Sequence, residues 1–341
     1  MLEAVDEASA QRVMARAFGW LTLRLALSIA PMLLSVFILS NSAYSQSNVE
    51  NEQDKTHSPE QLFEPRQFAV EAAESDQPAG TTPRVLNYRL MKPADYDPTA
   101  EYPLVIFLHG AGERGSDNTA QLKHAVANFC SPDMRQKYPC YVLAPQCPKD
   151  ESWADIDWTK PAIDQPASAS KSMNLVLALV DEMVEDAAID SKRIYLTGLS
   201  MGGYGTWDAI ARRPYFFAAA APVCGGADLA TASKIAHMPI WCFHGAKDRV
   251  VTVDLSRKMF QALKDAEGEP KYTEYPDAGH DSWTATYSDP EFLAWLFDQR
   301  LKPKPRQGDS RAKTTTRQNK QEEGTVTAPK MKSEDPEASI K

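Results

Sequence analysis

The chain has 341 residues, of which 43% are hydrophobic and 24% are charged, so its composition excludes collagen-like, coiled-coil and wholly disordered proteins. Its formal net charge of -9 and pI near 5.3 argue against a nucleic-acid partner, since such proteins need basic surface to displace phosphate counterions. The five cysteines lie between Cys130 and Cys242 without a CxxC pair, which excludes a disulfide-stapled mini-fold and predicts no metal site.

A hydrophobic segment near the N-terminus predicts export. Residues Phe18–Leu39 are apolar except for Arg24 and a few small polar side chains, and Ala43–Ser45 offers the small residues that a signal peptidase reads. We therefore expect residues 1–45 to be a signal peptide and the protein to be secreted or periplasmic. The alternative is an uncleaved anchor, which would be the only membrane contact, although Arg24 and Pro31 are unfavourable in a permanent span.

Two polar segments flank the predicted folded domain. Residues 46–82 and 303–341 are rich in charged and small polar side chains and show no apolar periodicity, which is typical of a disordered linker and a disordered tail. Residues 83–302 are long enough for a single domain and contain no internal repeat. We expect one folded unit between two disordered segments.

Short apolar runs alternate with longer helical patterns along this domain. The short runs are rich in β-branched and aromatic residues and predict strands, whereas apolar residues spaced three or four apart predict helices. The expected strands are Arg84–Met91, Tyr102–His109, Tyr141–Ala144, Arg193–Thr197, Phe217–Val223, Pro239–His244 and Tyr272–Tyr275. The expected helices are Ser172–Ala188, Gly202–Arg213, Val253–Ala266 and Pro290–Arg300. This alternation predicts an α/β fold with a mostly parallel central sheet, helices on both faces and an antiparallel first strand.

One serine occupies a strand-to-helix turn with a recognisable pattern. The sequence Gly198-Leu199-Ser200-Met201-Gly202 directly follows the strand RIYLT and directly precedes a helical pattern. A serine in a Gly-x-Ser-x-Gly elbow is held on a strained backbone with its hydroxyl exposed near the helix N-terminus. This context predicts that Ser200 is a nucleophile.

A histidine and an aspartate follow this serine in the order that the α/β-hydrolase fold uses. A serine hydroxyl needs a histidine base, and that histidine needs an acid to orient it. His280 follows a weak predicted strand, and Asp248 follows the strand PIWCFH, so both lie where such partners are expected. The alternative is that Asp248 caps the following helix and that Asp254 or Asp228 is the acid.

The loop after the second predicted strand is expected to complete the catalytic site. The sequence His109–Gly115 reads HGAGERG, and its glycines leave backbone N–H groups free to bind a substrate oxygen. We expect an oxyanion hole from the N–H groups of Ala111 and Met201, with Gly112 as the alternative to Ala111. His109 is expected to brace this loop.

Three further side chains are candidates for the substrate pocket. Trp153 and Trp283 offer apolar walls for an acyl or aryl group, although each is equally consistent with a place in the core. Glu113 is expected either to pair with Arg114 or to line the mouth of the site. The remaining histidines of the predicted domain, His124, His237 and His244, are expected to serve packing or turn structure.

The ordered motifs FLHGAGERGSDN, APQCP, GLSMGGYGTW, PVCGG, FHGAKDRVV and GHDSW carry a family resemblance. The stretch Arg84–Arg300 resembles the exported bacterial α/β-hydrolases of the predicted peptidase or phospholipase/carboxylesterase-like family, which are related to feruloyl esterases and polyhydroxybutyrate depolymerase-like enzymes. The resemblance implies Ser200 as nucleophile, Asp248 as acid, His280 as base and the loop around Ala111 as oxyanion hole.

The cysteines are expected to have structural roles. Cys224 and Cys242 lie in or beside predicted core strands and should behave as small buried hydrophobes. Cys130, Cys140 and Cys147 cluster around one strand, and in an exported protein one disulfide is expected among them, with three pairings open.

These features together predict an exported serine hydrolase that cleaves small-molecule or polymer-derived carboxylic esters through an acyl-enzyme, without a metal or organic cofactor. The first alternative is a serine peptidase of the same fold. A non-catalytic binding protein on this scaffold is a further alternative, against which the complete set of Ser200, Asp248 and His280 argues.

Overall fold

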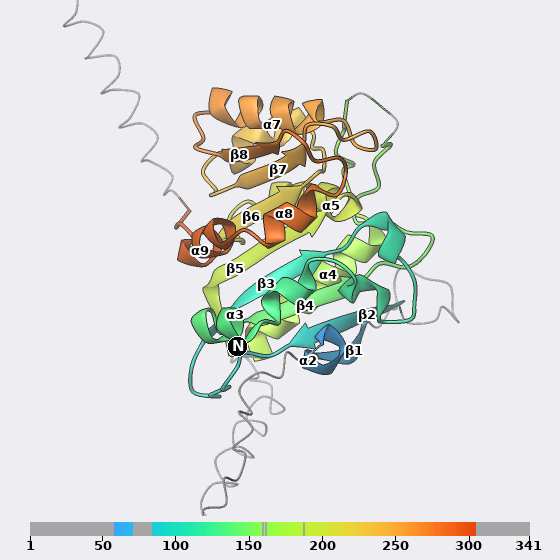
Figure 1. The fold of residues 1–341 in the computed structure, drawn as a ribbon. Coiled ribbons are helices and arrows are strands. Elements are labelled where there is room, and N and C mark those ends of the chain that lie inside the picture. The colour runs from blue at the N-terminus through green and yellow to red at the C-terminus, as the bar shows by residue number, and fades with distance from the viewer. Residues whose placement is uncertain (1–57, 71–83, 159, 161, 187, 305–341) are drawn as a thin grey trace, which may run out of the picture. The chain divides into compact units, whose positions relative to one another are not determined.

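An eight-stranded sheet forms the centre of the part of the chain that the computed structural model describes, namely residues 58–70, 84–158, 160, 162–186 and 188–304. The strands follow the spatial order β1-β2-β4-β3-β5-β6-β7-β8 (Figure 1). Strand β2 runs antiparallel to both of its neighbours, β1 and β4, and every other neighbouring pair is parallel. The bounds are β1 Phe63–Val70, β2 Arg84–Met91, β3 Tyr102–Leu108, β4 Tyr141–Gln146, β5 Ile189–Leu199, β6 Ala219–Val223, β7 Trp241–Gly245 and β8 Lys271–Tyr275. This topology confirms the predicted α/β-hydrolase fold and its antiparallel strand.

Helices cover both faces of this sheet, as predicted. Their bounds are α2 Pro59–Leu62, α3 Pro132–Lys137, α4 Lys171–Asp186, α5 Met201–Arg212, α6 Ala232–Ile235, α7 Asp254–Asp265, α8 Ser282–Tyr287 and α9 Pro290–Asp298. In Figure 1, α3, α8 and α9 lie in front of the sheet and α4 lies behind it. The four helices expected from apolar spacing are α4, α5, α7 and α9, and each boundary agrees to within two residues.

Alternate side chains of the strands enter two separate hydrophobic cores. On β3, Leu104 and Ile106 join the core that contains side chains of α4, α5 and α7, whereas Val105 and Phe107 join the core with α3, α8 and α9. Successive side chains of a strand point to opposite faces, so a strand buried on both sides is apolar at every position. This is why YPLVIFL shows a continuous apolar run rather than an alternating one.

The prediction of a disordered linker over residues 46–82 is wrong for residues 58–70. These residues form the short helix α2 and the edge strand β1, which pairs with β2 along its whole length. Only Phe63 and Phe68 of β1 are buried, and three of the four residues between them are polar, so the strand gives no alternating apolar signal. Pro65 is tolerated because an edge strand has one unpaired side. The predicted signal peptide, and the predicted C-terminal tail from residue 305 onward, lie outside the described residues.

The expected disulfide among Cys130, Cys140 and Cys147 is also wrong, because all five cysteines are buried and free. Cys130 and Cys140 belong to the core of α3, α8 and α9, whereas Cys147 belongs to the core on the opposite face of the sheet. Burial raises the pKa of all five thiols, to about 11 for Cys130 and to about 12 for the others. They therefore act as small apolar side chains.

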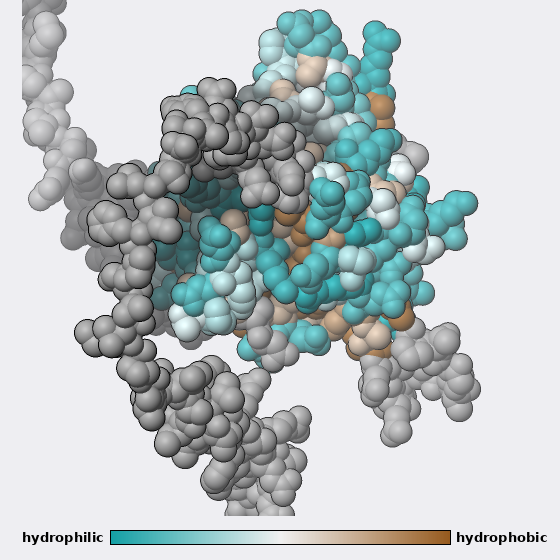
Figure 2. All heavy atoms as spheres, turned by 60° about the horizontal axis from the view of Figure 1, so that its bottom comes forward, coloured by the Kyte–Doolittle hydropathy of each residue, from teal (hydrophilic) through white to brown (hydrophobic). Residues whose placement is uncertain are grey.

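Hydrophilic side chains dominate the surface of the described residues on the face drawn in Figure 2, with small hydrophobic areas between them. The large hydrophobic side chains that the described residues expose are Val70, Val85, Tyr96, Trp158, Leu229 and Val250. Within the same residues, no helix has the length and apolar character that crossing a bilayer requires. Two of the exposed side chains, Trp158 and Val250, lie beside the candidate active site.

Candidate active site

Ser200 lies on the sharp turn between strand β5 and helix α5, as predicted. Its backbone has φ 54° and ψ -116°, a left-handed conformation that is uncommon for a residue with a side chain. The turn is held because the Ser200 N–H donates to the Val223 carbonyl and the Ser200 carbonyl accepts from the Tyr204 N–H. The hydroxyl is therefore presented at the carboxyl edge of the sheet, at the N-terminus of α5.

The glycines of the elbow allow α5 to approach strand β3. A Cβ atom on Gly202 would lie 1.9 Å from the carbonyl oxygen of Leu108, and one on Gly198 would lie 2.5 Å from the carbonyl oxygen of Gly202. Both conflicts are with backbone, which cannot rotate away as a side chain can. These two positions therefore require glycine for close packing.

Replacing Gly202 with alanine is expected to lower the free energy of unfolding by about 3 kcal/mol, because the new methyl group overlaps the backbone of β3. Urea denaturation followed by circular dichroism measures the change. Gly112→Ala is the control, because a Cβ there has no neighbour within 4 Å, and it should shift stability by less than about 1 kcal/mol. Equal losses in the two variants would contradict the packing explanation.

The structure brings the three predicted catalytic side chains together. The Nε2 atom of His280 lies 2.9 Å from the Ser200 Oγ atom, and its Nδ1 atom lies 2.7 Å from Asp248 Oδ2. A carboxylate only accepts hydrogen bonds, so Nδ1 donates to Asp248 and Nε2 is left to accept from the Ser200 hydroxyl. Loops after β7 and β8 carry Asp248 and His280, respectively.

Asp248 is held as an anion by several donors. Burial acts to raise its pKa, but hydrogen bonds from His244 and His280 and from the N–H groups of Val250 and Val251 outweigh burial and hold the pKa well below its usual range. The two backbone N–H groups bind Oδ1, so Asp248 also organises the turn that follows it. The alternative acids, Asp228 and Asp254, make their contacts elsewhere.

His244 contacts the acid, which the sequence analysis missed. Its side chain is fully buried, and its Nε2 atom lies 2.9 Å from the Val251 carbonyl and 3.2 Å from Asp248 Oδ2. The carbonyl can only accept, so Nε2 carries the hydrogen, and Nδ1 accepts from Ser256 Oγ at 2.7 Å. Two histidines thus face one carboxylate. The sequence contains one signal for this contact, namely the spacing of four residues between His244 and Asp248.

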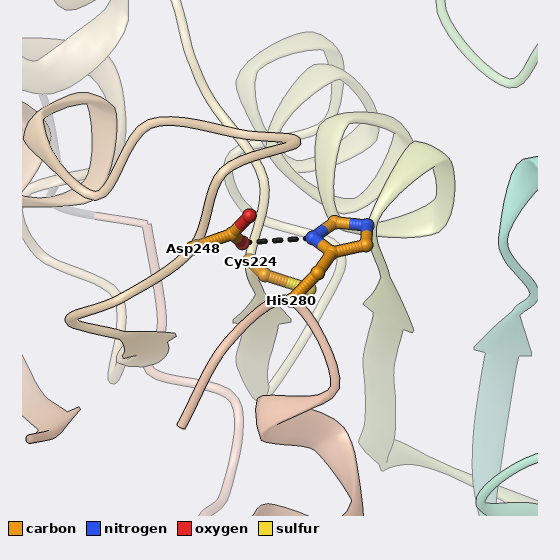
Figure 3. A group of neighbouring side chains, drawn as sticks. All are labelled: Cys224, Asp248 and His280. Carbon is orange, nitrogen blue, oxygen red and sulfur yellow. Dashed lines mark hydrogen bonds and ion pairs between the residues drawn. The ribbon is translucent and has the colours of Figure 1, made fainter. Parts of the chain in front are cut away.

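Cys224 lies beside this pair, in the loop after β6 (Figure 3). Its Sγ atom and the ligand atoms of Asp248 and His280 lie within 4.8 Å of one another, the one such group of potential metal ligands among the described residues. Burial keeps the Cys224 thiol protonated at neutral pH, and the dashed line in Figure 3 shows that His280 and Asp248 are bonded to each other. The donor set therefore fits a hydrogen-bonded dyad with an apolar neighbour better than a metal centre.

The loop after β3 and the start of α5 each place one free backbone N–H group near the serine. Ala111 begins a short 3-10 helix and Met201 begins α5, and neither N–H donates a hydrogen bond within the described part of the chain. Arg114 holds the loop by donating from Nε to the Ala111 carbonyl at 3.0 Å. This geometry suits an oxyanion hole.

The buried side chain of His109 stabilises the same loop through two hydrogen bonds. The Cys147 N–H donates to His109 Nε2, so Nδ1 carries the hydrogen and donates to the Gly110 carbonyl at 2.6 Å. Burial lowers the pKa of His109 to about 4, which keeps the ring neutral. Trp153 was a candidate for the pocket, but it lies in the core, where its Nε1 donates to the His109 carbonyl.

A cavity of about 270 Å³ opens above Ser200 and His280. The expected pocket residues Trp283 and Glu113 line it. Of the further lining side chains that sequence reasoning missed, His124, Trp158 and Tyr204 are aromatic. Trp158 stacks on Tyr204 with ring centroids 5.6 Å apart, while the Trp283 ring meets that of His280 edge-on at 5.3 Å. The cavity thus joins the catalytic residues to an aromatic wall.

Comparisons with known proteins find esterases among the proteins that are similar to this chain. A thermostable esterase of known structure is 39% identical, with a TM-score of 0.62, and the match covers 70% of this chain and 63% of that one. The poly(3-hydroxyalkanoate) depolymerase C of Paucimonas lemoignei is 30% identical over 43% of this chain and 33% of its own length. The carboxylesterase SOBER1 of Arabidopsis thaliana is 23% identical over 52% of this chain and 82% of its own.

The chain thus spans about a third of the depolymerase and less than two thirds of the esterase structure. The family model described as Phospholipase/Carboxylesterase matches residues 97–290, which is more than half of the chain and includes Ser200, Asp248 and His280. With the eight-stranded sheet and the serine elbow already described, this match shows that the chain belongs to the Phospholipase/Carboxylesterase family of α/β-hydrolases.

Proposed function

We propose that this chain is a serine esterase that cleaves carboxylic esters through an acyl-enzyme on Ser200. The observation that supports this most strongly is the position of His280, whose two ring nitrogens lie within hydrogen-bonding distance of Ser200 and Asp248. Membership of a carboxylesterase family supports the ester as the substrate bond. The expected substrates are small-molecule or polymer-derived esters.

In the first half-reaction, the Ser200 oxygen attacks the ester carbonyl carbon while His280 Nε2 takes the hydroxyl proton. The negative oxygen that forms is stabilised by the N–H groups of Ala111 and Met201 and by the N-terminus of α5. Collapse of this intermediate breaks the bond to the alcohol, which leaves with the proton from Nε2. Asp248 stabilises the imidazolium and keeps the ring oriented.

In the second half-reaction, water attacks the acyl group on Ser200 and gives a proton to His280 Nε2. The same backbone N–H groups stabilise the second tetrahedral intermediate, and its collapse returns the proton to the Ser200 oxygen and releases the carboxylic acid. Every step uses side chains and backbone of the chain itself, without a metal or cofactor.

Ester and amide substrates distinguish this proposal from a serine peptidase. We expect the purified full chain to hydrolyse short p-nitrophenyl esters and to show at least about 100-fold lower kcat/KM on the matched p-nitroanilides. An amine is a poorer leaving group than an alcohol, so the peptidase has to supply more leaving-group protonation. Comparable kcat/KM values on the two series would favour the peptidase instead.

Export is a second part of the proposal and rests on the apolar segment Phe18–Leu39. N-terminal sequencing of the mature protein, after expression with its leader in a bacterial host, tests it. A new N-terminus just after Ser45 is expected. A protein that keeps residues 1–45 and sediments with membranes would indicate the anchor.

His244 is expected to position the acid of the triad. Replacing His244 with phenylalanine removes the Nε2 donor at 3.2 Å from Asp248 Oδ2, so the carboxylate and His280 should shift. We expect kcat for p-nitrophenyl acetate to fall by about 10- to 100-fold, because displacements near 1 Å cost this much in rate.

The matched control for this variant is His237→Phe. His237 also binds a carbonyl oxygen, that of Pro214 at 2.8 Å, but it lies on a different loop and away from the cavity. Its kcat should stay within about twofold of the unsubstituted chain. A normal kcat for His244→Phe, with an unchanged melting temperature, would contradict the positioning role.

A further inference from the structure

Glu113 places a buried carboxylate in the cavity that contains Ser200. Its side chain is 7% exposed, and a Cβ atom on Gly110 would lie 3.1 Å from Glu113 Oε2 and 3.7 Å from the Ser200 Cβ. The Glu113 carboxylate and the Ser200 side chain thus both lie close to Gly110, at the start of the oxyanion loop.

The backbone of Glu113 is fixed, but its carboxylate receives no hydrogen bond within the described part of the chain. Its N–H donates to the Gly110 carbonyl at 3.3 Å, and its carbonyl accepts from Gln146 Nε2 at 3.2 Å. The side chain of His124 also faces the carboxylate, but its Nε2 is 3.6 Å from Oε1, which is too long for a hydrogen bond. Its oxygens can still accept hydrogen bonds, so a donor from the substrate side of the cavity would stabilise the carboxylate.

The rest of the cavity has a different character. Trp158 stacks on Tyr204, and these two rings lie with Val250 and Val251 among the lining residues. The only polar groups on these four side chains are the Tyr204 hydroxyl and the Trp158 N–H. The cavity is therefore apolar on this side and acidic at Glu113.

The proton transfer from His280 indicates which half of the ester lies on the Glu113 side of the cavity and which lies on the apolar side. His280 has to protonate the departing alcohol, so the alcohol group lies beside the His280 ring. A chain of contacts leads from that ring to Trp283 at 5.3 Å, from Trp283 to His124 at 5.5 Å, and from His124 to Glu113. Glu113 therefore faces the alcohol, and the apolar wall faces the acyl group.

We propose that Glu113 is a specificity residue that accepts a hydrogen bond from a hydroxyl group on the alcohol portion of the ester, so that the enzyme prefers esters of neutral polyols. The proposal rests on the proposed esterase function and on the carboxylate in the cavity that accepts no hydrogen bond from the described part of the chain. A choline ester would be disfavoured, because its trimethylammonium group has no N–H or O–H and cannot donate the hydrogen bond that Glu113 accepts.

Three acetate esters with different alcohols test this proposal with the full chain: 2,3-dihydroxypropyl acetate, propyl acetate and acetylcholine. Acid release at constant pH gives kcat/KM for each ester. We expect the dihydroxypropyl ester to exceed propyl acetate by about 10-fold, as one hydrogen bond to a charged acceptor allows, and to exceed acetylcholine as well. The preference should fall to about twofold or less in Glu113→Ala.

Two further variants separate recognition from damage to the fold. Glu113→Gln keeps the shape and one acceptor oxygen and should retain an intermediate preference, even if both Glu113 variants have lower melting temperatures. Val250→Ala alters the acyl side and should change kcat/KM for the two neutral esters by the same factor.

Several results would overturn the proposal. These are equal kcat/KM values for the dihydroxypropyl and propyl esters in the unsubstituted chain, an unchanged preference in Glu113→Ala, or a preference for acetylcholine. If the unsubstituted chain cleaves none of these esters and no p-nitrophenyl acetate, the esterase function itself fails and this proposal fails with it. Normal cleavage of p-nitrophenyl acetate with no polyol preference contradicts only the role of Glu113.

Discussion

Replacing Ser200 with alanine is expected to reduce kcat for p-nitrophenyl acetate by about 10⁴-fold or more, to the level that the remaining site supports without a nucleophile. The hydroxyl removed is the one 2.9 Å from His280 Nε2, and no other serine hydroxyl lines the cavity among the described residues. The fold should persist, because the Ser200 side chain caps no helix and the backbone bonds of the turn remain.

A matched serine controls for general effects of this substitution. Ser282 is also buried and begins α8, close to His280, but its hydroxyl is absent from the cavity lining. We expect Ser282→Ala to keep kcat within about threefold of the unsubstituted chain. A large and equal loss in the two variants would mean that the loss reflects structure rather than the nucleophile.

Replacing Asp248 with asparagine is expected to lower kcat by about 10⁴-fold while preserving the packing of the loop. An asparagine amide can donate to His280 Nδ1, which favours the ring tautomer with its hydrogen on Nε2 and removes the acceptor that Ser200 needs. The kcat for p-nitrophenyl acetate measures this loss. Asp277→Asn is the control, since Asp277 is exposed and pairs with Lys247, and its kcat should be unchanged.

The same substitution should change how stability depends on pH. The pKa of Asp248 is held below its usual range, so this carboxylate contributes stability that is present above its unfolded pKa, near 4, and lost as the pH falls through the lower folded value. We expect the difference in unfolding free energy between the original chain and Asp248→Asn to shrink as the pH is lowered below about 4. A difference that grows on acidification would contradict this account.

The contacts between the three catalytic side chains are predictable from the sequence. The elbow is one contiguous motif, and its strand and helix context restricts Ser200 to a single place in the fold. Asp248 and His280 follow strands whose carboxyl ends meet at the same sheet edge as the end of β5, so their meeting follows from the parallel order of β5 to β8. Chain order and the parallel arrangement of these strands together therefore predict the catalytic contacts.

Apart from the His244–Asp248 contact, the features that the sequence analysis missed depend on contacts between distant segments. Strand β1 is stabilised by pairing with β2 rather than by its own apolar pattern, so it resembles a polar linker. Trp153 and Trp158 are separated by five positions, yet one is buried under His109 and the other is exposed beside Tyr204. No periodicity distinguishes two aromatic residues in an irregular loop, so their burial depends on tertiary packing.

Covalent labelling with an alkyl fluorophosphonate tests the central role of Ser200 most directly. The serine oxygen should form a bond to phosphorus and displace fluoride, with His280 taking the proton. For the full chain, the account predicts one label on the peptide that contains Ser200, loss of p-nitrophenyl acetate hydrolysis in proportion to labelling, and no label in Ser200→Ala. A label on another residue that accompanies the loss of hydrolysis, or full activity in a completely labelled chain, would contradict it.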